Sequence, residues 1–160
     1  SWQQTINTDL NSAFYVTRLV IPFMKAQSGG VILNMSSSAG RYGCPLRSPY
    51  VAAKWAAIGL AQTWAMELGP WNIRVNALCP GSVGGERIDR VIVRDAKERG
   101  VEPEAIRTIY QRQSSLRAFA SAEDIAAMVC FLVGPGGQMI SGQTIGIDGH
   151  TETLANWLDP

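Results

Sequence analysis

Two short apolar segments joined by one long helical pattern constrain the fold of this chain more than any other feature. Residues 31–35 and 73–78 are rich in aliphatic side chains and are bounded by turn residues, as buried strands of a parallel sheet are. The stretch between them, 49–68, is long enough for a helix and is rich in alanine. A strand, a helix and a second strand in this order predict a right-handed crossover between parallel strands.

The rest of the chain continues this alternation. Apolar residues recur at helical spacing over 2–25, the sequence Ser-Ala-Glu-Asp at 121–124 is typical of a helix start, and 144–147 has the pattern of a last strand. We therefore predict an α/β protein that forms part of a doubly wound, Rossmann-like parallel sheet, with three strands and flanking helices.

Residues 84–119 differ in character from the segments on either side. They are rich in charge and are interrupted by Gly100 and Pro103, which favours two short helices, each with one apolar stripe. An insertion near the carboxyl ends of the strands is where a substrate lid would lie. We interpret 1–160 as the carboxyl-terminal part of one Rossmann-like domain, with a lid-like helical insertion at about 84–119.

Composition excludes several classes of function. The 160 residues carry a formal net charge of +1, and the charges from Glu86 to Arg107 are of mixed sign, so no basic stripe is offered to nucleic acid. The apolar run at 19–24 is far shorter than the ~20 residues that a membrane span needs.

The chain starts at Ser1 and enters a helical pattern at once, so we expect it to belong to a longer protein.

The three cysteines, Cys44, Cys79 and Cys130, are odd in number and far apart, which fits neither a disulfide framework nor, with His150 as the single histidine, a zinc site. This usage favours a reducing, cytoplasmic setting. Cys79 could be read as a nucleophile, but it lies in an apolar run, which favours a role in the core.

One segment carries the chemistry. Ser37 follows the first apolar segment, and Tyr50 and Lys54 are four residues apart, so they share one helix face if Ser48 caps that helix and Pro49 occupies its first turn. A phenol is a poor acid or base near pH 7, but an adjacent ammonium favours the phenolate. Such a pair suits proton transfer, and a serine can hold the reacting oxygen; the same spacing also occurs by chance.

This arrangement resembles the short-chain dehydrogenase/reductase family. The resemblance implies that Ser37 binds the substrate oxygen, that Tyr50 is the general acid or base, and that Lys54 assists it and binds the nicotinamide ribose. The thirteen-residue step to Tyr50 favours Ser37 over its neighbours Ser36 and Ser38. It also implies a cofactor, NAD or NADP, and a small-molecule substrate with a carbonyl or alcohol group.

The same resemblance assigns further residues. Pro80, Gly81 and Val83 match the loop that approaches the nicotinamide, although an ordinary Pro-Gly turn would have the same sequence pattern. Residues 140–143 and 147–149 resemble the flanks of the family's last strand. The first helix and the helix at 49–68 resemble those that pair in the family's homodimers and homotetramers, so we expect such an assembly in the full-length protein.

Two departures from the family stand out. Asp9 occupies the place where the family commonly has an asparagine that holds a relay water, and Asn7 and Asn11 point elsewhere on the helix. The family's glycine-rich turn after its first strand has no counterpart here, nor has the residue that chooses between NAD and NADP.

We therefore expect an oxidoreductase that transfers a hydride between NAD(P) and a secondary alcohol or ketone, with no metal and with the isolated 160 residues inactive. The alternative is a non-catalytic binding or assembly subunit of the same fold. A natural stand-alone domain would leave 31–35 as an exposed edge. The isoleucines of 84–119, with Arg87, Arg90 and Arg107, are compatible with an apolar or a mildly acidic substrate, and a solvated helix face explains the arginines at least as well.

Overall fold

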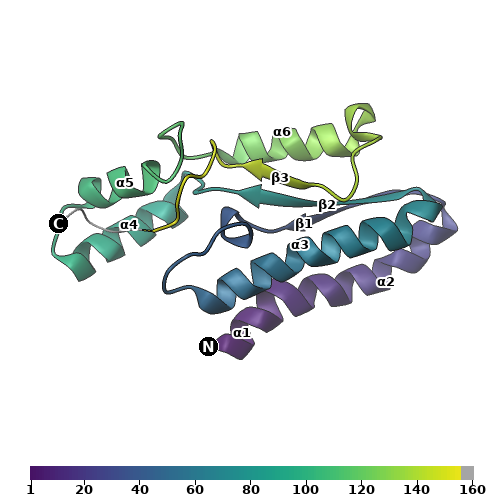
Figure 1. Ribbon diagram of the computed structural model, residues 1–160, viewed down its shortest axis with the longest axis horizontal. Coiled ribbons are helices and arrows are strands. Elements are labelled where there is room, and N and C mark those ends of the chain that lie inside the picture. The colour runs from purple at the N-terminus through teal and green to yellow at the C-terminus, as the bar shows by residue number, and fades with distance from the viewer. Residues whose placement is uncertain (156–160) are drawn as a thin grey trace.

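A computed structural model describes residues 1–155. Its three strands, β1 (Gly30–Met35), β2 (Ile73–Pro80) and β3 (Thr144–Ile147), form one parallel sheet in the order β1-β2-β3 (Figure 1). The pairing runs from Gly30 opposite Ile73 to Pro80 opposite Ile147. The predicted α/β fold with a parallel sheet is confirmed, and β2 extends two residues beyond its predicted end.

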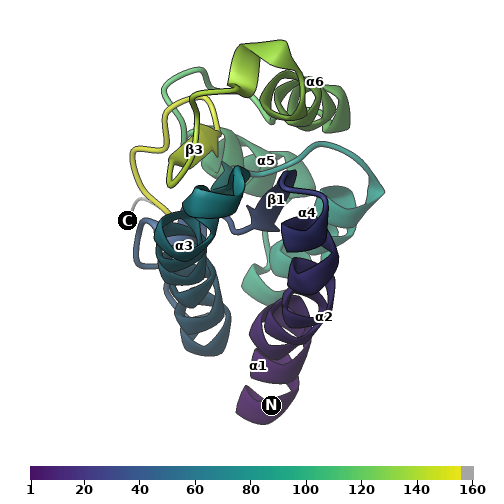
Figure 2. The ribbon, with the colours of Figure 1, turned by 90° about the vertical axis from the view of Figure 1, so that its right-hand side faces the viewer.

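Helices cover both faces of the sheet. The first helical segments and α3 (Ser48–Leu68) lie on one face, and α6 (Ala122–Val133) lies on the other (Figure 2). The inward side of α3 carries alanines together with Trp64 and Leu68, which pack against Ile73, Val75 and Ala77 of β2. Small side chains let the helix approach the strand closely, so much of the alanine-rich pattern serves this packing.

The start of α3 differs from the prediction. Arg47, with φ −126° and ψ 30°, occupies the cap position, and no side chain caps the helix. Ser48 is already helical, so the prediction that Ser48 caps the helix is wrong. Pro49 does lie in the first turn, where its missing N–H has no intrahelical partner to lose.

The predicted first helix is interrupted. It consists of α1 (Trp2–Ile6), a π-helical turn η1 (Asn7–Asn11) and α2 (Ser12–Ala26). The N–H of Ser12 donates to the carbonyl of Asn7, five residues back, and the Ser12 hydroxyl donates to the carbonyl of Thr8 at 2.6 Å. The hydroxyl thus satisfies a carbonyl in the widened turn, which periodicity alone could not reveal.

The prediction that 31–35 is a buried strand is only partly right. Of β1, Asn34 alone is buried among the described residues, and Met35 is 48% exposed. The reason is its place in the sheet: β1 is an edge strand with one partner, β2.

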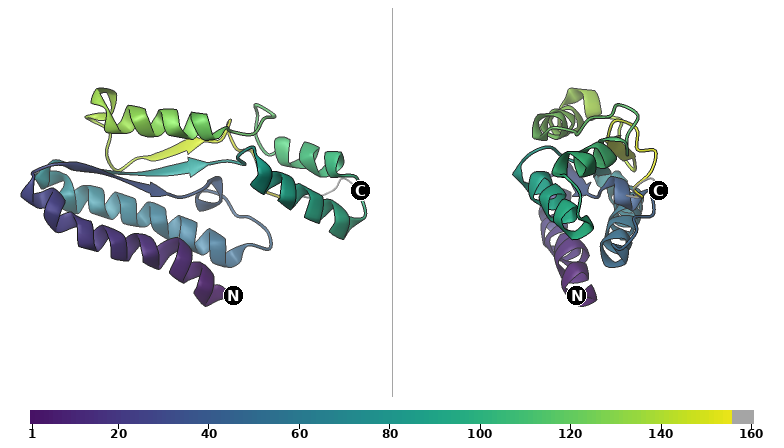
Figure 3. Two further views of the ribbon diagram at one scale, coloured as in Figure 1. Left: turned by 180° about the vertical axis from the view of Figure 1, so that it is seen from behind. Right: turned by 90° about the vertical axis from the view of Figure 1, so that its left-hand side faces the viewer.

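Two helices, α4 (Glu86–Arg99) and α5 (Pro103–Gln111), lie beyond the carboxyl ends of the strands (Figure 3). They bury one apolar cluster between them, formed by Ile92, Ala96, Ile106 and Tyr110. The two short helices are therefore present as predicted. Their role as a lid stays a prediction, as does the domain extent, whose last five residues lie outside the described part.

The segment 140–143, directly before β3, is tied to the middle of β2 by Asn76. Asn76 is fully buried; its amide nitrogen donates to the carbonyl of Ile140 at 2.9 Å, and its amide oxygen accepts from the N–H of Gln143 at 3.0 Å.

None of the helices among residues 1–155 combines the length and apolar character that crossing a membrane requires.

The start of α6 carries the predicted capping box. Ser121 accepts from the N–H of Asp124 at 3.0 Å, and the Asp124 carboxylate accepts from the N–H of Ser121 at 2.8 Å. The bonds from Ser121 lower the pKa of Asp124. We expect Ser121→Ala to lower the free energy of unfolding by about 0.5–2 kcal/mol.

Urea denaturation of the wild type and Ser121→Ala at two pH values checks this expectation. A carboxyl whose folded pKa is depressed stabilises the protein above its unfolded pKa, and this contribution is lost as the pH falls through the folded pKa. The difference should therefore shrink below about pH 4. A difference that grows in acid would contradict the capping role.

Candidate active site

Ser37 lies at the carboxyl end of β1, just before the short 3₁₀ helix η2 (Ser38–Gly40). Its backbone is extended, and its hydroxyl oxygen accepts a hydrogen bond from the N–H of Ala39 at 3.2 Å. A hydroxyl that accepts through its oxygen keeps its proton to donate. Ser37 can therefore cap η2 and also donate to a ligand oxygen.

The neighbouring Ser36 has a different environment. It is buried, and its hydroxyl donates to the backbone carbonyl of Lys54 at 2.7 Å. Gly40 packs against the same carbonyl, since a Cβ there would lie 2.8 Å from the oxygen, too close for any larger residue. Ser36 and Gly40 thus join the loop that carries Ser37 to the backbone of α3.

Tyr50 and Lys54 are one turn apart on α3. The ammonium nitrogen of Lys54 lies 5.4 Å from the centroid of the Tyr50 ring, so the cation and the phenol are near neighbours. The Tyr50 hydroxyl has no hydrogen-bond partner among residues 1–155. Its proton and lone pairs are therefore available to a ligand.

Lys54 itself is held firmly. The side chain is largely buried, and Nζ donates to the carbonyl of Met35 at 3.1 Å, at the end of β1. Nζ also lies 3.5 Å from the carboxylate of Asp9, in the π-helical turn η1. The departure noted at Asp9 thus has a structural role: a carboxylate from the first helical segment contacts the ammonium directly.

The loop after β2 is fixed by two neighbours. The backbone of Gly81 passes so close to Asp148 that a Cβ would lie 3.0 Å from its Cα, which explains the need for glycine. Val83 forms an isolated parallel bridge with Ala120, and the N–H of Gly84 donates to the Ala120 carbonyl at 2.9 Å. The loop is therefore held in one position beside the carboxyl end of β2.

One cavity brings together four of the six predicted site residues: Ser37, Tyr50, Gly81 and Val83. Lys54 and Pro80 do not line it. Lys54 lies beneath Tyr50, and Pro80 is the last residue of β2, where it positions the loop. The chemical roles of all six stay predictions.

The cavity also has a wall that sequence reasoning missed. Arg47, Cys44, Tyr110, Gln113 and Leu154 line it, together with residues of α4. Arg47 directly precedes the helix that carries Tyr50, which was a usable signal. The others come from loops and helices whose packing over the carboxyl ends of the strands has no local pattern.

The thiols and the second phenol near the site are poor nucleophiles or bases. Burial raises the pKa of Cys44, although Arg47 partly offsets this, and burial also raises the pKa of Cys79 and of Tyr110. These groups therefore stay protonated at neutral pH. Cys79 is fully buried, which confirms its predicted core role.

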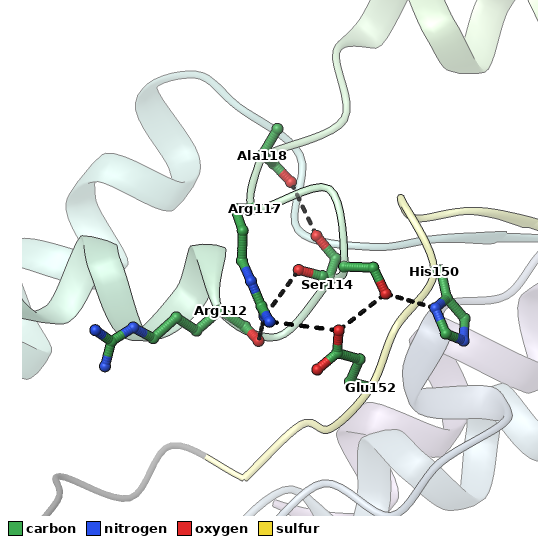
Figure 4. A network of polar contacts seen from close by, with 7 residues as sticks. Arg112, Ser114, Arg117, Ala118, His150 and Glu152 are labelled. Carbon is green, nitrogen blue, oxygen red and sulfur yellow. Dashed lines mark hydrogen bonds and ion pairs between the residues drawn. The ribbon is translucent and has the colours of Figure 1, made fainter.

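A second polar cluster lies apart from this cavity. Figure 4 shows Glu152 and Arg117, 3.5 Å apart, beside His150. Ser115 donates to Glu152 at 2.9 Å and contacts Nδ1 of His150. Because the carboxylate contacts the serine and not the histidine, this is not the order of a hydrolase triad. The cluster joins the loop after α5 to the tail.

Comparison with known proteins agrees with this architecture. A family model described as enoyl-(acyl carrier protein) reductase matches residues 1–150. The 3-oxoacyl-[acyl-carrier-protein] reductase FabG of Thermotoga maritima is 36% identical over 148 residues, 92% of this chain and 56% of that protein. The chain belongs to the short-chain dehydrogenase/reductase family.

Two further relatives extend the comparison. Trans-4-hydroxycyclohexanecarboxylate dehydrogenase of Sinomonas cyclohexanicum is 37% identical over 155 residues, 97% of this chain and 53% of that protein. The crystal structure of an NAD⁺-bound xylitol dehydrogenase matches with a TM-score of 0.84 and 30% identity, over 91% of this chain and 58% of that chain. The chain thus spans about half the length of the relatives it matches.

Proposed function

We propose that this chain carries the proton-transfer machinery of an oxidoreductase that moves a hydride between NAD(P) and a secondary alcohol or ketone. The observation that supports it most is the shared cavity of Ser37 and Tyr50, with Lys54 beneath the tyrosine ring. The relatives named as a 3-oxoacyl reductase and a xylitol dehydrogenase act on a ketone and an alcohol by their names.

Ser37, Tyr50 and Lys54 have different roles in the proposed reaction. Ser37 donates its free proton to the substrate oxygen and orients it. Tyr50 gives a proton to that oxygen when a ketone is reduced, and takes one from the hydroxyl when an alcohol is oxidised. Lys54, 5.4 Å from the ring centroid, stabilises the negative charge that Tyr50 develops when it loses its proton.

The donor set fits a nicotinamide cofactor. The Tyr50 hydroxyl is unpartnered among residues 1–155, and the loop of Gly81 and Val83 borders the same cavity. When bound, NAD or NADP supplies or accepts the hydride. We propose that Lys54 and Tyr50 bind its ribose, and that Pro80, Gly81 and Val83 form the wall against its nicotinamide ring.

We also propose how the chain fits into the full-length protein. We infer that residues 1–160 correspond to the carboxyl-terminal part of one nucleotide-binding domain, because Ser37, Tyr50 and the loop at Gly81 follow the order of the family's catalytic half. The isolated chain is then inactive, with 84–119 as lid. The full-length protein assembles as a homodimer or homotetramer in the cytoplasm, in keeping with its three free thiols.

The test is a cofactor-linked assay of the complete protein with a panel of secondary alcohols and ketones, followed as absorbance of the reduced nicotinamide. The proposal expects turnover with NAD or NADP. Cofactor binding without turnover of any carbonyl or alcohol would support the alternative, a non-catalytic subunit. That alternative draws on one observation, the direct Asp9 contact to Lys54.

Asp9→Leu tests whether the contact between Asp9 and Lys54 supports the proposed catalysis. Among residues 1–155, the Asp9 carboxylate and the Met35 carbonyl hold the Lys54 ammonium, and the substitution removes the first of them. We expect kcat of the complete protein to fall by about tenfold, as for loss of one interaction with a charged group. Asp9→Asn, which keeps an oxygen at this position, should retain most activity. Equal activity of wild type and Asp9→Leu would show that the contact is incidental.

A further inference from the structure

The cavity that holds Ser37 and Tyr50 is positively charged. Two arginines, Arg47 and Arg87, line it, and no acidic residue of the described part does. In its remaining wall, apolar side chains such as Ile88 and Val91 of α4 alternate with serine, tyrosine and glutamine side chains. A cleft of one charge sign attracts ligands of the opposite sign.

Arg87 is the exception among the arginines of α4. Each acidic residue of that helix pairs with a different arginine: Glu86 with Arg90, Asp89 with Arg107, Asp95 with Arg99 and Glu98 with Arg94. Arg87 makes no ion pair within residues 1–155. It therefore presents an uncompensated charge on the side of α4 that lines the cavity.

Arg47 lines the same cavity from the start of α3. It directly precedes α3, and its charge lowers the pKa of both the Cys44 thiol and the Tyr110 phenol against the effect of burial. Both of these side chains line the cavity. Within the described part of the chain Arg47 also makes no ion pair. Its guanidinium thus lies close to the cavity wall, three residues before Tyr50.

We propose that Arg47 and Arg87 bind an anionic group of the substrate, a carboxylate or a phosphate, so that the substrate is an acidic ketone or secondary alcohol. Arginine suits this task because its planar fork matches both anions. The reacting carbon lies at Ser37 and Tyr50, and Ile88 and Val91 contact the carbon chain. This inference rests on the proposed function and names the substrate class of the same site.

The experiment measures kcat/KM of the complete protein for ketones in matched pairs. The carboxylate pairs are 3-oxobutanoate and 4-oxopentanoate, each with its methyl ester. The phosphate pair is hydroxyacetone phosphate with hydroxyacetone. The variants are Arg47→Gln and Arg87→Gln. Arg90→Gln is the matched control, because Arg90 lies on the same helix, pairs with Glu86 and does not line the cavity.

We expect the wild type to prefer the anionic member of at least one pair by about tenfold or more. Each of Arg47→Gln and Arg87→Gln should lower kcat/KM for that anion by about 10- to 100-fold. The neutral partner should change by less than about threefold, and Arg90→Gln should change neither. The pair that responds identifies carboxylate or phosphate as the anion.

Two results would overturn the inference. One is an equal loss for the anionic and neutral substrates. The other is a rise in the KM of the cofactor with the anion preference intact, which would assign the arginines to the cofactor's phosphates. Calorimetric binding of the anions to the Tyr50→Phe protein separates this inference from the proposed reaction. If the anions bind in a manner that depends on Arg87 but the wild type shows no turnover, the proposed reaction is wrong and the anion site stands. If the anions do not bind, the anion site is wrong.

Discussion

We expect turnover by the complete protein to fall roughly 10²- to 10⁴-fold when Tyr50 is replaced by Phe, because the substitution removes the proposed general acid or base. The substitution removes one oxygen atom and keeps the ring near Lys54. Because the Tyr50 hydroxyl has no hydrogen-bond partner among residues 1–155, its removal leaves no protein group unsatisfied. The free energy of unfolding should therefore change by less than about 0.5 kcal/mol.

Steady-state kinetics and urea denaturation of the same preparation check both halves of this expectation. Tyr42→Phe is the matched control, since Tyr42 is a nearby phenol that does not line the cavity. Residual activity of Tyr50→Phe within about tenfold of the wild type would be too high for loss of a proton-transfer group. A collapse of stability would instead assign Tyr50 a structural role.

The largest expected loss of stability follows Asn76→Leu. The change removes the acceptor for the N–H of Gln143. It also removes the donor that lies 2.9 Å from the Ile140 carbonyl oxygen. Among the described residues, that carbonyl then accepts only a 3.4 Å hydrogen bond from Arg74. Polar groups that lose their partners in the interior cost about 1–3 kcal/mol each. We expect the free energy of unfolding to fall by roughly 2–4 kcal/mol in total.

Chemical denaturation of the complete protein measures this effect. Asn7→Leu is the control, because Asn7 is exposed on the first helical segment and ties no strands together. Its change should stay below about 1 kcal/mol. If Asn76→Leu cost no more than the control, the attachment of β3 to β2 would have to depend on the backbone pairing alone.

The pattern of strands and helices was readable from the sequence because each element carries its own local signal. β3 has the predicted bounds, and β1 and the helices α4 and α5 lie where the pattern indicated. The errors arise where distant segments decide the outcome. Cys79 and Pro80 join β2 because Gly146 and Ile147 pair with them, 67 residues later in both cases.

The candidate site divides in the same way. Ser37, Tyr50, Gly81 and Val83 could be named from spacing and from a family resemblance, since the ends of parallel strands converge. Tyr110 could not, because its position beside the cavity depends on how α5 packs, whereas Arg47, directly before the helix of Tyr50, had a signal that was overlooked. The contact between Asp9 and Lys54 needed the π-helical turn, which no periodicity predicted.

The close approach of Gly40 to the carbonyl of Lys54 has a consequence for how such a protein can change over evolutionary time. Gly40 and Ser36 join the loop of Ser37 to the backbone of α3 at this carbonyl, and both lie outside α4 and α5. We therefore expect substitutions in residues 84–111 that preserve the fold to change the cavity wall and leave this junction in place. Under the proposed function, substrate choice and proton transfer would then lie in separate parts of one short chain.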